Sequence, residues 1–322
     1  MNILLAGSFD DAAELDAWVH ALNAALAQAL PGGHRLLTAR GEVPDDHITA
    51  AIVANPPPGS LQGLPKLCLI QSLWAGVDRL LADATLPAGV PIARMVDPMM
   101  NEAMAETALW AVLALHRGFF TYARHQAAGR WQPHAQRRAD EVPVLVLGAG
   151  QMGGTVARRL AANGYPVTVW RRQGASATSQ ALDGLTVRQG TEALHHALAG
   201  TQVLVNLLPL TPETRGLIDA ALLARLPRGA GLVNLARGAH VVDADLLAAL
   251  DAGHIGHAVL DVFTTEPLPA DHRYWQHPQV TVLPHAAAQT DARTAAAIAA
   301  ANLAALDQGR PIANEVVRAA GY

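Results

Sequence analysis

Short apolar runs alternate with longer amphipathic segments along almost the whole chain. A strand buried in a parallel sheet is a nearly continuous apolar run, whereas a helix on the sheet repeats apolar residues every three or four positions. In the first part of the chain the pattern predicts strands at 2–6, 35–38, 50–54, 67–71 and 92–95. A helical pattern over 12–30 stops at Pro31-Gly32-Gly33, a usual helix terminator. These segments predict a small α/β domain.

The alternation becomes regular from residue 142, after a long helix predicted over 101–122. Strands are predicted at 143–147, 166–171, 203–207, 231–235, 257–262 and 280–283, with helices starting near Met152, Thr191, Asp219 and Asp243. Parallel strands joined by right-handed helical crossovers form a doubly wound sheet. A last helix, predicted over 291–307, is too short to form a domain, so we expect it to pack on the first domain.

The first strand of the regular part ends directly in Gly148-Ala149-Gly150-Gln151-Met152-Gly153, and a helical pattern follows. In a G-x-G-x-x-G turn the first glycine allows the tight turn, the second a close approach to a pyrophosphate, and the third close helix–strand packing. The free N–H groups and the dipole at the start of the helix favour a negative charge. The motif stands between a predicted strand and a predicted helix, and we therefore predict dinucleotide binding rather than a structural turn.

The end of the next strand, Trp170-Arg171-Arg172, indicates the kind of dinucleotide. A fold that selects NAD carries an acidic residue about 20 residues beyond the glycines, where it accepts from the ribose 2′-OH. This chain has two arginines there, and a guanidinium suits a 2′-phosphate. We predict NADP(H), with NAD possible but less favoured; the alternative is a pair of solvated surface arginines. Further candidates for phosphate contacts are Ser176, Thr178 and Ser179.

The composition of the chain argues against several classes of function. The chain is 51% apolar and 16% charged, which is typical of a folded protein, and its net charge of -4 gives no basic footprint for nucleic acid. No apolar run is long enough to span a bilayer, and the N-terminus lacks the basic segment and cleavage site of a signal peptide. Cys68 is the only cysteine, so no internal disulfide or Cys-based zinc site is expected. We expect a cytoplasmic protein without a metal site.

Three candidate catalytic side chains, Arg237, Glu266 and His285, follow predicted strands. The carboxyl ends of parallel strands share one edge of a sheet, so all three can point at one site. A guanidinium holds a carboxylate and polarises a neighbouring carbonyl, and a histidine passes a proton near neutral pH. A carboxylate beside that histidine raises its pKa and orients the ring. Hydride addition to a 2-keto acid needs these functions. Taken alone, however, such an arginine is usually a solvated charge, such a glutamate a loop residue and such a histidine a structural one.

Taken together, the strings around these residues resemble the signature blocks of the D-2-hydroxyacid dehydrogenase family. The blocks are Asn234–Gly238, Leu260–Pro269 and Leu283–His285, and they stand in the family's order. The segment 207–214 resembles the loop that borders the cofactor in that family, and 72–78 resembles its substrate-carboxylate loop. The resemblance implies a Rossmann-type doubly wound parallel sheet of residues 101–285. This dinucleotide-binding domain is inserted into a smaller flavodoxin-like α/β substrate domain of residues 1–100 plus 286–322. The cleft between the two domains is the expected active site.

The resemblance also implies roles for the candidate residues. Arg237 would bind the substrate carboxylate and carbonyl, His285 would protonate the carbonyl oxygen, and Glu266 would support the imidazolium. Asp261 would bind the nicotinamide carboxamide. The implied cofactor contacts are Gly148, Gly150, Gln151, Met152, Gly153, Trp170, Arg171, Arg172, Leu208, Pro209, Thr214, Ala236 and Asp261.

In the first domain, backbone N–H groups of Ala75, Gly76 and Val77 would hold the substrate carboxylate. Trp74 would form a wall of the pocket, with a packed aromatic as the alternative. Trp131 resembles a residue that related dimers contribute to the neighbour's active site, and a homodimer is expected on the same ground.

One departure concerns the substrate. Many relatives carry Gly-Ser after the histidine, where this chain has Ala286-Ala287-Ala288, so a substrate hydroxyl finds no serine there and needs another partner. Trp74, the arginine pair and the ending 318–322 are most similar to the glyoxylate/hydroxypyruvate reductase A branch. We therefore expect NADPH-dependent reduction of glyoxylate and hydroxypyruvate. The alternatives are a reductase of bulkier or aromatic 2-keto acids such as phenylpyruvate, and a nucleotide-sensing interaction protein on the same fold.

Overall fold

The computed structural model describes residues 1–172 and 182–321, which form two compact units. Unit 1 consists of Met1–Met100 and Thr290–Tyr322, and unit 2 of Asn101–Gln289. The second boundary thus falls after Gln289, whereas the sequence placed it before Ala286. The candidate phosphate contacts Ser176, Thr178 and Ser179 lie outside the described residues.

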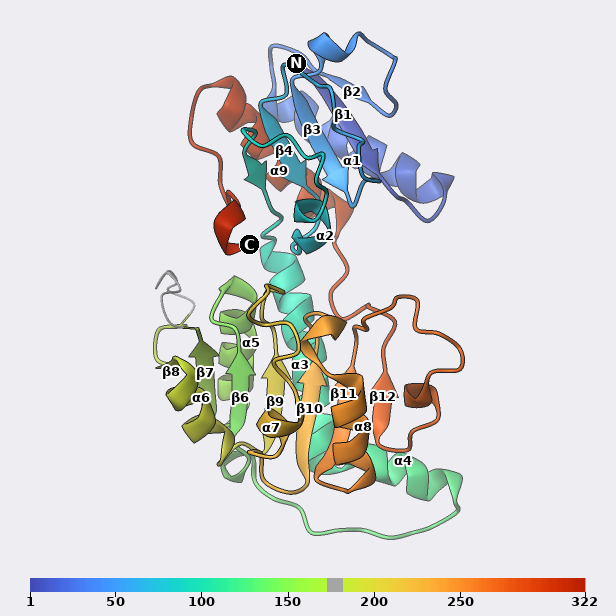
Figure 1. Cartoon of the computed structure of the whole chain (residues 1–322), viewed down its shortest axis with the longest axis vertical. Helices are drawn as coiled ribbons and strands as arrows, with labels where there is room; N and C mark the ends of the chain where they lie inside the picture. The colour runs from blue at the N-terminus through green and yellow to red at the C-terminus, as the bar shows by residue number, and fades with distance from the viewer. Residues whose placement is uncertain (173–181, 322) are drawn as a thin grey trace. The chain divides into compact units, whose positions relative to one another are not determined.

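Unit 1 is built on a parallel sheet with the strand order β2-β1-β3-β4-β5 (Figure 1). Its strands are β1 (Asn2–Gly7), β2 (Arg35–Leu37), β3 (Ala50–Ala54), β4 (Leu69–Ser72) and β5 (Ile92–Ala93). Its helices are α1 (Ala12–Ala29), α2 (Asp78–Leu81) and α9 (Ala292–Asp307). The order 2-1-3-4-5 is that of flavodoxin-like sheets, as the sequence predicted.

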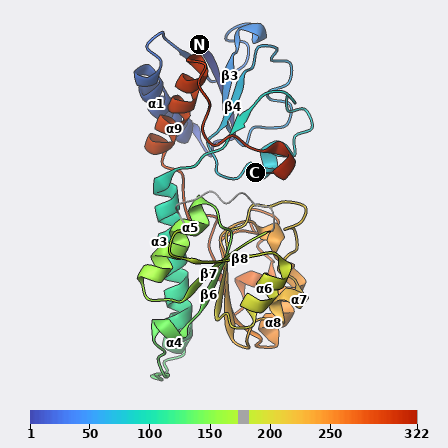
Figure 2. The same ribbon diagram turned by 90° about the vertical axis from the view of Figure 1, so that its left-hand side faces the viewer.

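The last helix, α9, packs beside α1 on one face of the unit 1 sheet (Figure 2). Its buried face consists mainly of alanines, whose small side chains allow a close approach. Asn302 in α9 is also buried, and its Nδ2 donates to Gln71 Oε1 in β4 at 2.7 Å. A buried amide with a partner is far less costly than one without, so this bond fixes α9 on the sheet.

Unit 2 is built on a parallel sheet with the order β12-β11-β10-β9-β6-β7-β8. Its strands are β6 (Val144–Leu147), β7 (Val167–Arg171), β8 (Thr186–Gln189), β9 (Val203–Asn206), β10 (Ala230–Asn234), β11 (Ile255–Leu260) and β12 (Val280–Val282). Its helices are α3 (Pro98–Arg117), α4 (Phe119–Ala127), α5 (Gln151–Ala162), α6 (Thr191–Leu198), α7 (Ala220–Leu223) and α8 (Asp243–Asp251). In Figure 2, α3 and α5 cover one face of this sheet and α6, α7 and α8 the other. The doubly wound Rossmann-type prediction is confirmed.

Two elements of unit 2 differ from the prediction. The edge strand β8 was not predicted, because its residues are mostly exposed and lack a buried apolar run. The long helix predicted over 101–122 is broken at Gly118, which has a φ of 71° and separates α3 from α4. A Cβ at Gly118 would lie 2.3 Å from Nε2 of His134, so this exposed ring would have to move, but the left-handed conformation is what favours glycine here.

Among the helices within the described residues, none combines the length and the apolar character that a bilayer crossing requires.

Candidate active site

The turn after β6 has the geometry of a phosphate cradle. Gly148 has a φ of 115°, and a Cβ there would lie 2.6 Å from the carbonyl oxygen of Leu207. A Cβ on Gly153 would lie 1.9 Å from the carbonyl oxygen of Gly148, so only glycine lets α5 begin this close to β6. A Cβ on Gly150 would meet no atom within 4 Å, so this glycine faces open space at the start of α5. The turn lies where the strand order reverses, and it fits a pyrophosphate.

The strand beside β6 ends in the arginine pair. Arg171 closes β7, and Arg172 follows it; both are half-buried. Nη1 of Arg172 lies 2.9 Å from Oε2 of Glu213. The indole of Trp170 is only 4% exposed, packs in the unit 2 core and donates to the carbonyl of Gly190 at 2.8 Å. We therefore assign this indole to the core, and the two arginines remain the candidate phosphate contacts.

The loop after β9 is held by its own side chains. Thr214 is buried, and its Oγ1 donates to the carbonyl oxygen of Pro209 and accepts the N–H of Thr211, both at 2.8 Å. Leu208 is buried in the core of unit 2. The side chains of Leu208 and Thr214 thus shape the loop, which lies at the same edge of the sheet as the glycine turn.

Arg237 follows β10 and lies close to the loop after β11. Its neighbour Gly238 makes this approach possible, because a Cβ there would lie 1.9 Å from the carbonyl carbon of Phe263. Arg237 is half-buried, and its Nη1 donates to the carbonyl oxygen of Ala236 at 2.8 Å. Its positive charge lowers the pKa values of both Glu266 and His285 to some degree, so the three predicted catalytic residues lie together.

Glu266 and His285 form an ion pair in which Oε2 lies 2.8 Å from Nδ1. The other carboxylate oxygen, Oε1, accepts the N–H of Phe263 at 2.9 Å. The hydrogen bond to Glu266 raises the pKa of His285 above its usual value, although burial opposes it. Burial alone would raise the pKa of Glu266, but the bonds from His285 and Phe263 outweigh it and the pKa is lowered. The pair therefore favours an imidazolium with Nδ1 bound and Nε2 available to an acceptor.

The backbone of His285 is held by Asp261. His285 has a φ of 54°, an uncommon conformation for a non-glycine residue, and its N–H donates to the Asp261 carbonyl at 2.9 Å. The Asp261 carboxylate is 1% exposed and accepts the N–H groups of Ala286 at 2.8 Å and Ala287 at 3.1 Å. Burial raises the pKa of Asp261 while these two bonds lower it, and the net direction is upward. Asp261 thus clamps the turn that carries the histidine.

Three buried polar residues that sequence reasoning missed connect these loops. Nδ2 of Asn206 donates to Oδ1 of Asn234 at 2.9 Å, and Nδ2 of Asn234 donates to the carbonyl oxygen of Arg237 at 3.0 Å. The ring of His240 lies between the carbonyl oxygens of Arg237 and Pro209, at 3.1 and 3.3 Å. The asparagines end β9 and β10 and lie inside the strands predicted at 203–207 and 231–235, where a polar residue within an apolar run was the available signal.

In unit 1 the predicted carboxylate loop follows β4 and leads into α2. Ala75 and Gly76 are half-buried, and Val77 is buried. The indole of Trp74 packs edge to face on Trp18 with ring centroids 5.9 Å apart. The ring thus packs against the core of unit 1 while the residue is only half-buried, and its role as a pocket wall stays a prediction.

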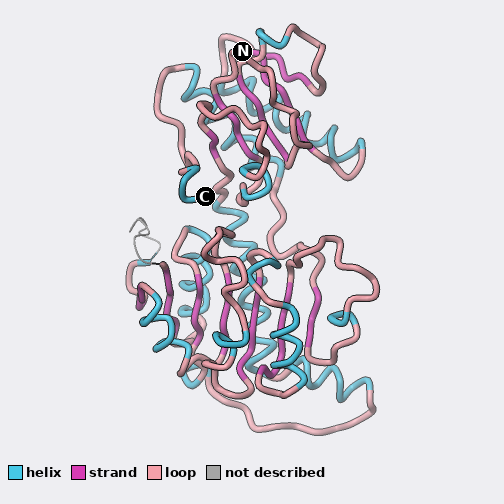
Figure 3. The backbone as a smooth tube through the Cα atoms, in the orientation of Figure 1, coloured by secondary structure: helices cyan, strands magenta, loops and turns pink. Residues whose placement is uncertain are grey.

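Trp131 is 99% exposed. It lies in the long segment between α4 and β6, most of which is loop (Figure 3). Among the residues that the structure describes, no three His, Cys, Asp or Glu side chains are grouped as a metal site.

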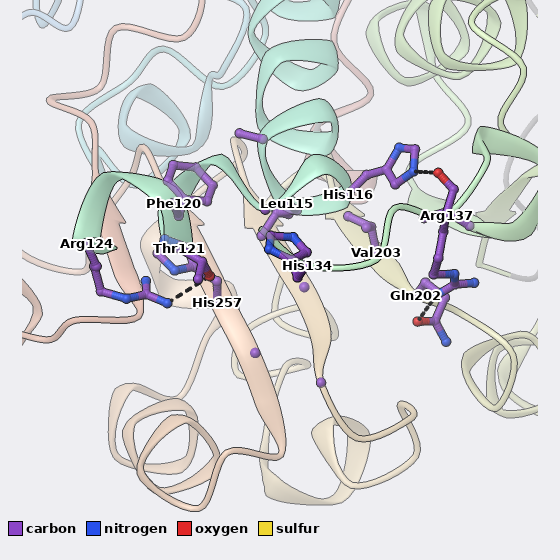
Figure 4. A pocket seen from close by; sticks show the side chains of 16 residues that line it. Leu115, His116, Phe120, Thr121, Arg124, His134, Arg137, Gln202, Val203 and His257 are labelled. Carbon is purple, nitrogen blue, oxygen red and sulfur yellow. Dashed lines mark hydrogen bonds between the residues drawn. The ribbon is translucent and has the colours of Figure 1, made fainter. Parts of the chain in front are cut away.

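A cavity of about 290 Å³ lies at the opposite, amino end of the unit 2 sheet (Figure 4). It is lined by residues at the starts of β9, β10 and β11 and by α3, α4 and the loop after α4, including Phe120, Arg124, His134, Arg137 and His257. None of the predicted site residues lines it, so this cavity is separate from the candidate active site.

Comparison with known proteins decides the family. A family model described as "D-isomer specific 2-hydroxyacid dehydrogenase, NAD binding domain" matches residues 109–287, more than half of the chain. The chain belongs to this family. The match covers the glycine turn, Arg237, Glu266 and His285.

Similar members of the family are known over the full length of the chain. A glyoxylate/hydroxypyruvate reductase A of Serratia proteamaculans is 40% identical and covers 100% of both chains. A D-isomer specific 2-hydroxyacid dehydrogenase of Xanthobacter autotrophicus Py2, solved in complex with NADPH and MES, is 40% identical with a TM-score of 0.90, covering 100% of this chain and 99% of that one. An NADPH-dependent glyoxylate/hydroxypyruvate reductase of Sinorhizobium meliloti, solved with NADP and sulfate, is 33% identical with a TM-score of 0.87 and the same coverage. These relatives confirm the predicted resemblance to the glyoxylate/hydroxypyruvate reductase A branch.

Proposed function

We propose that this chain is an NADP-dependent 2-hydroxyacid dehydrogenase that reduces small 2-keto acids, with glyoxylate and hydroxypyruvate as the preferred substrates. The observation that carries the proposal is the ion pair of His285 with Glu266, 2.8 Å apart and close to Arg237. This arrangement supplies a proton donor, a group that keeps it protonated, and a cation for a carboxylate.

The proposed roles are supported by this geometry. The bound nicotinamide nucleotide supplies the hydride. Arg237 binds the carboxylate and polarises the carbonyl of the keto acid. His285 donates the proton on Nε2 to the carbonyl oxygen, while Glu266, bound to Nδ1, orients the ring and stabilises the charged form. Three alanines follow His285, so the hydroxyl of hydroxypyruvate needs a partner elsewhere in the site.

The glycine turn after β6 holds the pyrophosphate, and Arg171 and Arg172 bind the 2′-phosphate. The complexes of the Xanthobacter relative with NADPH and of the Sinorhizobium relative with NADP support this choice of cofactor. The further proposed contacts come from backbone and side-chain groups of the surrounding loops: Gln151, Met152, Leu208, Pro209, Thr214, Ala236 and Asp261. NAD remains the less favoured cofactor.

Backbone N–H groups of Ala75, Gly76 and Val77 are proposed to bind the substrate carboxylate. We also propose a homodimer in which Trp131 is contributed to the active site of the second copy. The support for this is the near-complete exposure of an indole, because indoles are enriched at protein–protein interfaces.

The test is the rate of NADPH and NADH oxidation, followed by absorbance, with glyoxylate, hydroxypyruvate, pyruvate and phenylpyruvate. The proposal predicts faster turnover with NADPH and the highest kcat/KM for glyoxylate or hydroxypyruvate. A preference for phenylpyruvate would keep the chemistry and overturn the substrate class. Tight NADPH binding without turnover of any keto acid would favour a nucleotide-sensing protein instead.

A further inference from the structure

Arg172 is held by an acidic residue to which the sequence assigned no role. Nη1 of Arg172 lies 2.9 Å from Oε2 of Glu213, in an ion pair whose arginine is half-buried and whose glutamate is exposed. The same Oε2 accepts the hydroxyl of Thr211 at 2.8 Å. The Glu213 carboxylate is therefore bound within its own loop as well as to Arg172.

The pair joins two loops on either side of the glycine turn. Arg172 follows β7 and Glu213 lies in the loop after β9, and these two strands flank β6 in the sheet (Figure 1). The glycine turn follows β6 at the same edge. The contact thus spans the position at which a dinucleotide would lie against this sheet.

The loop that carries Glu213 is held by hydrogen bonds between its own residues. The N–H of Thr211 donates to Oγ1 of Thr214, which in turn donates to the carbonyl oxygen of Pro209. The pKa of Glu213 lies below its usual value. The largest cause is the hydrogen bond from the Thr211 hydroxyl, and a backbone hydrogen bond and Arg172 add smaller effects. The carboxylate stays ionised near neutral pH, and its position is set by its own loop rather than by Arg172.

From this geometry we infer that Glu213 is a positioning residue for NADP(H): it orients Arg172 so that the rest of the guanidinium meets the 2′-phosphate. The inference rests on the proposed use of NADP. A guanidinium has five N–H donors in a rigid fork, so one terminal nitrogen can bind Glu213 while the others bind a phosphate. A long side chain that is already ordered loses less conformational freedom when the phosphate binds.

Glu213 has two opposite effects on a 2′-phosphate bound at Arg172. A carboxylate near the 2′-phosphate repels it, whereas a carboxylate that orients Arg172 favours it. Because the negative charge of Glu213 is balanced by Arg172 and the same carboxylate oxygen accepts the Thr211 hydroxyl, we expect orientation to be the larger effect.

The test is a set of Kd values for NADPH and NADH, measured by nicotinamide fluorescence on the purified full-length chain. Glu213→Ala is expected to weaken NADPH binding about two- to fivefold, the range for an exposed ion pair, and to leave NADH binding unchanged. Glu213→Gln keeps an oxygen that accepts both bonds, so it is expected to restore most of the loss. In an Arg172→Ala background, Glu213→Ala is expected to have no further effect on NADPH.

Asp251→Ala is the control, because it removes another exposed carboxylate of unit 2, which pairs with Arg273 at 3.1 Å and with His277 at 3.3 Å, far along the chain from the glycine turn. Neither Kd should change in this variant. Tighter NADPH binding by Glu213→Ala would overturn the inference, since Glu213 would then compete with the phosphate. Equal losses for NADPH and NADH would also overturn it, by showing that the loop had changed. If the protein binds NADPH but reduces no keto acid, the proposed function is wrong. The Kd values of the variants would still test the role of Glu213.

Discussion

The carboxylate of Glu266 lies 2.8 Å from Nδ1 of His285, although 19 residues separate the two in the chain. Each partner is also fixed independently of the other. Glu266 accepts the N–H of Phe263, and the turn at His285 is bound to Asp261. A contact held at both partners favours the charged form of the histidine and orients its ring, and a proton donor needs both.

Glu266→Gln tests the electrostatic part of this contact. Loss of the negative charge lowers the pKa of His285, which the carboxylate raises in the native protein. Reduction needs the protonated ring, so its rate falls as the pH rises through this pKa. The fall-off of kcat/KM should therefore move to lower pH, as a pH–rate profile would show. An unchanged profile would mean that the two groups are not coupled.

Arg237→Ala should lower kcat/KM for the keto acid by about 100-fold or more, the usual cost of removing one preorganised donor at a developing negative charge. Both a higher KM and a lower kcat are expected, because the guanidinium acts on bound substrate and on the transition state. Arg237→Lys is the matched control: it keeps the charge but not the fork, and should recover only part of the loss. An Arg237→Ala variant with the kcat/KM of the wild type would show that Arg237 does not bind the substrate.

Asp261→Asn tests the clamp on the histidine turn. An amide has only one acceptor oxygen, so one of the N–H groups of Ala286 and Ala287 would face an amide donor. An unsatisfied buried group of this kind costs about 1–3 kcal/mol of unfolding free energy. We expect that loss in denaturant unfolding, together with a lower kcat. A variant with native stability and lower activity would instead indicate a direct role at the cofactor.

Replacing Arg171 and Arg172 together by alanine should weaken NADPH by about 10- to 100-fold, the range for charge-assisted hydrogen bonds, and NADH much less. The measurement is the pair of KM values for the two nucleotides at a saturating keto acid concentration. Equal losses for both nucleotides would point to a folding defect rather than to a phosphate site.

His257 lies at the other end of the unit 2 sheet. Because its pKa is shifted in the folded protein, we expect the free energy of unfolding to depend on pH. Burial, with smaller effects of Arg124 and His277, lowers its pKa to about 4, and the ring is 8% exposed. The unfolded chain takes up the proton first as the pH falls below the usual histidine value, so stability is lost between pH 6.5 and about 4. The loss from this group amounts to roughly 3 kcal/mol at most. His257→Gln should flatten this part of the stability curve in urea unfolding, and an unchanged slope would contradict the assignment.

Much of this architecture could be predicted from the sequence, because buried parallel strands are apolar runs and the glycine turn has a strict spacing. The strand β8 was missed for the opposite reason, since an exposed edge strand needs no apolar run. Gly118 was included in a helix because a single glycine in a helical pattern does not show that it takes a left-handed conformation in the folded chain.

Some residues of the candidate site could likewise be predicted from the sequence, and others could not. Arg237, Glu266 and His285 were found because each follows a predicted strand. The roles of Asn206 and Glu213 were not, because their partners Asn234 and Arg172 lie 28 and 41 residues away in the chain. The indole of Trp170, predicted as a cofactor contact, packs in the core of unit 2, and the sequence pattern did not indicate this position for it. Periodicity places a side chain on a face of an element but does not tell what it meets there.

The most direct test compares the wild type with His285→Gln, in single-turnover oxidation of bound NADPH by glyoxylate and by hydroxypyruvate. We predict rapid oxidation by the wild type, and a loss of about 100-fold or more in the variant, the usual contribution of a general acid, with an unchanged Kd for NADPH. Oxidation by the variant at the wild-type rate, or no oxidation by the wild type with either acid, would contradict the account.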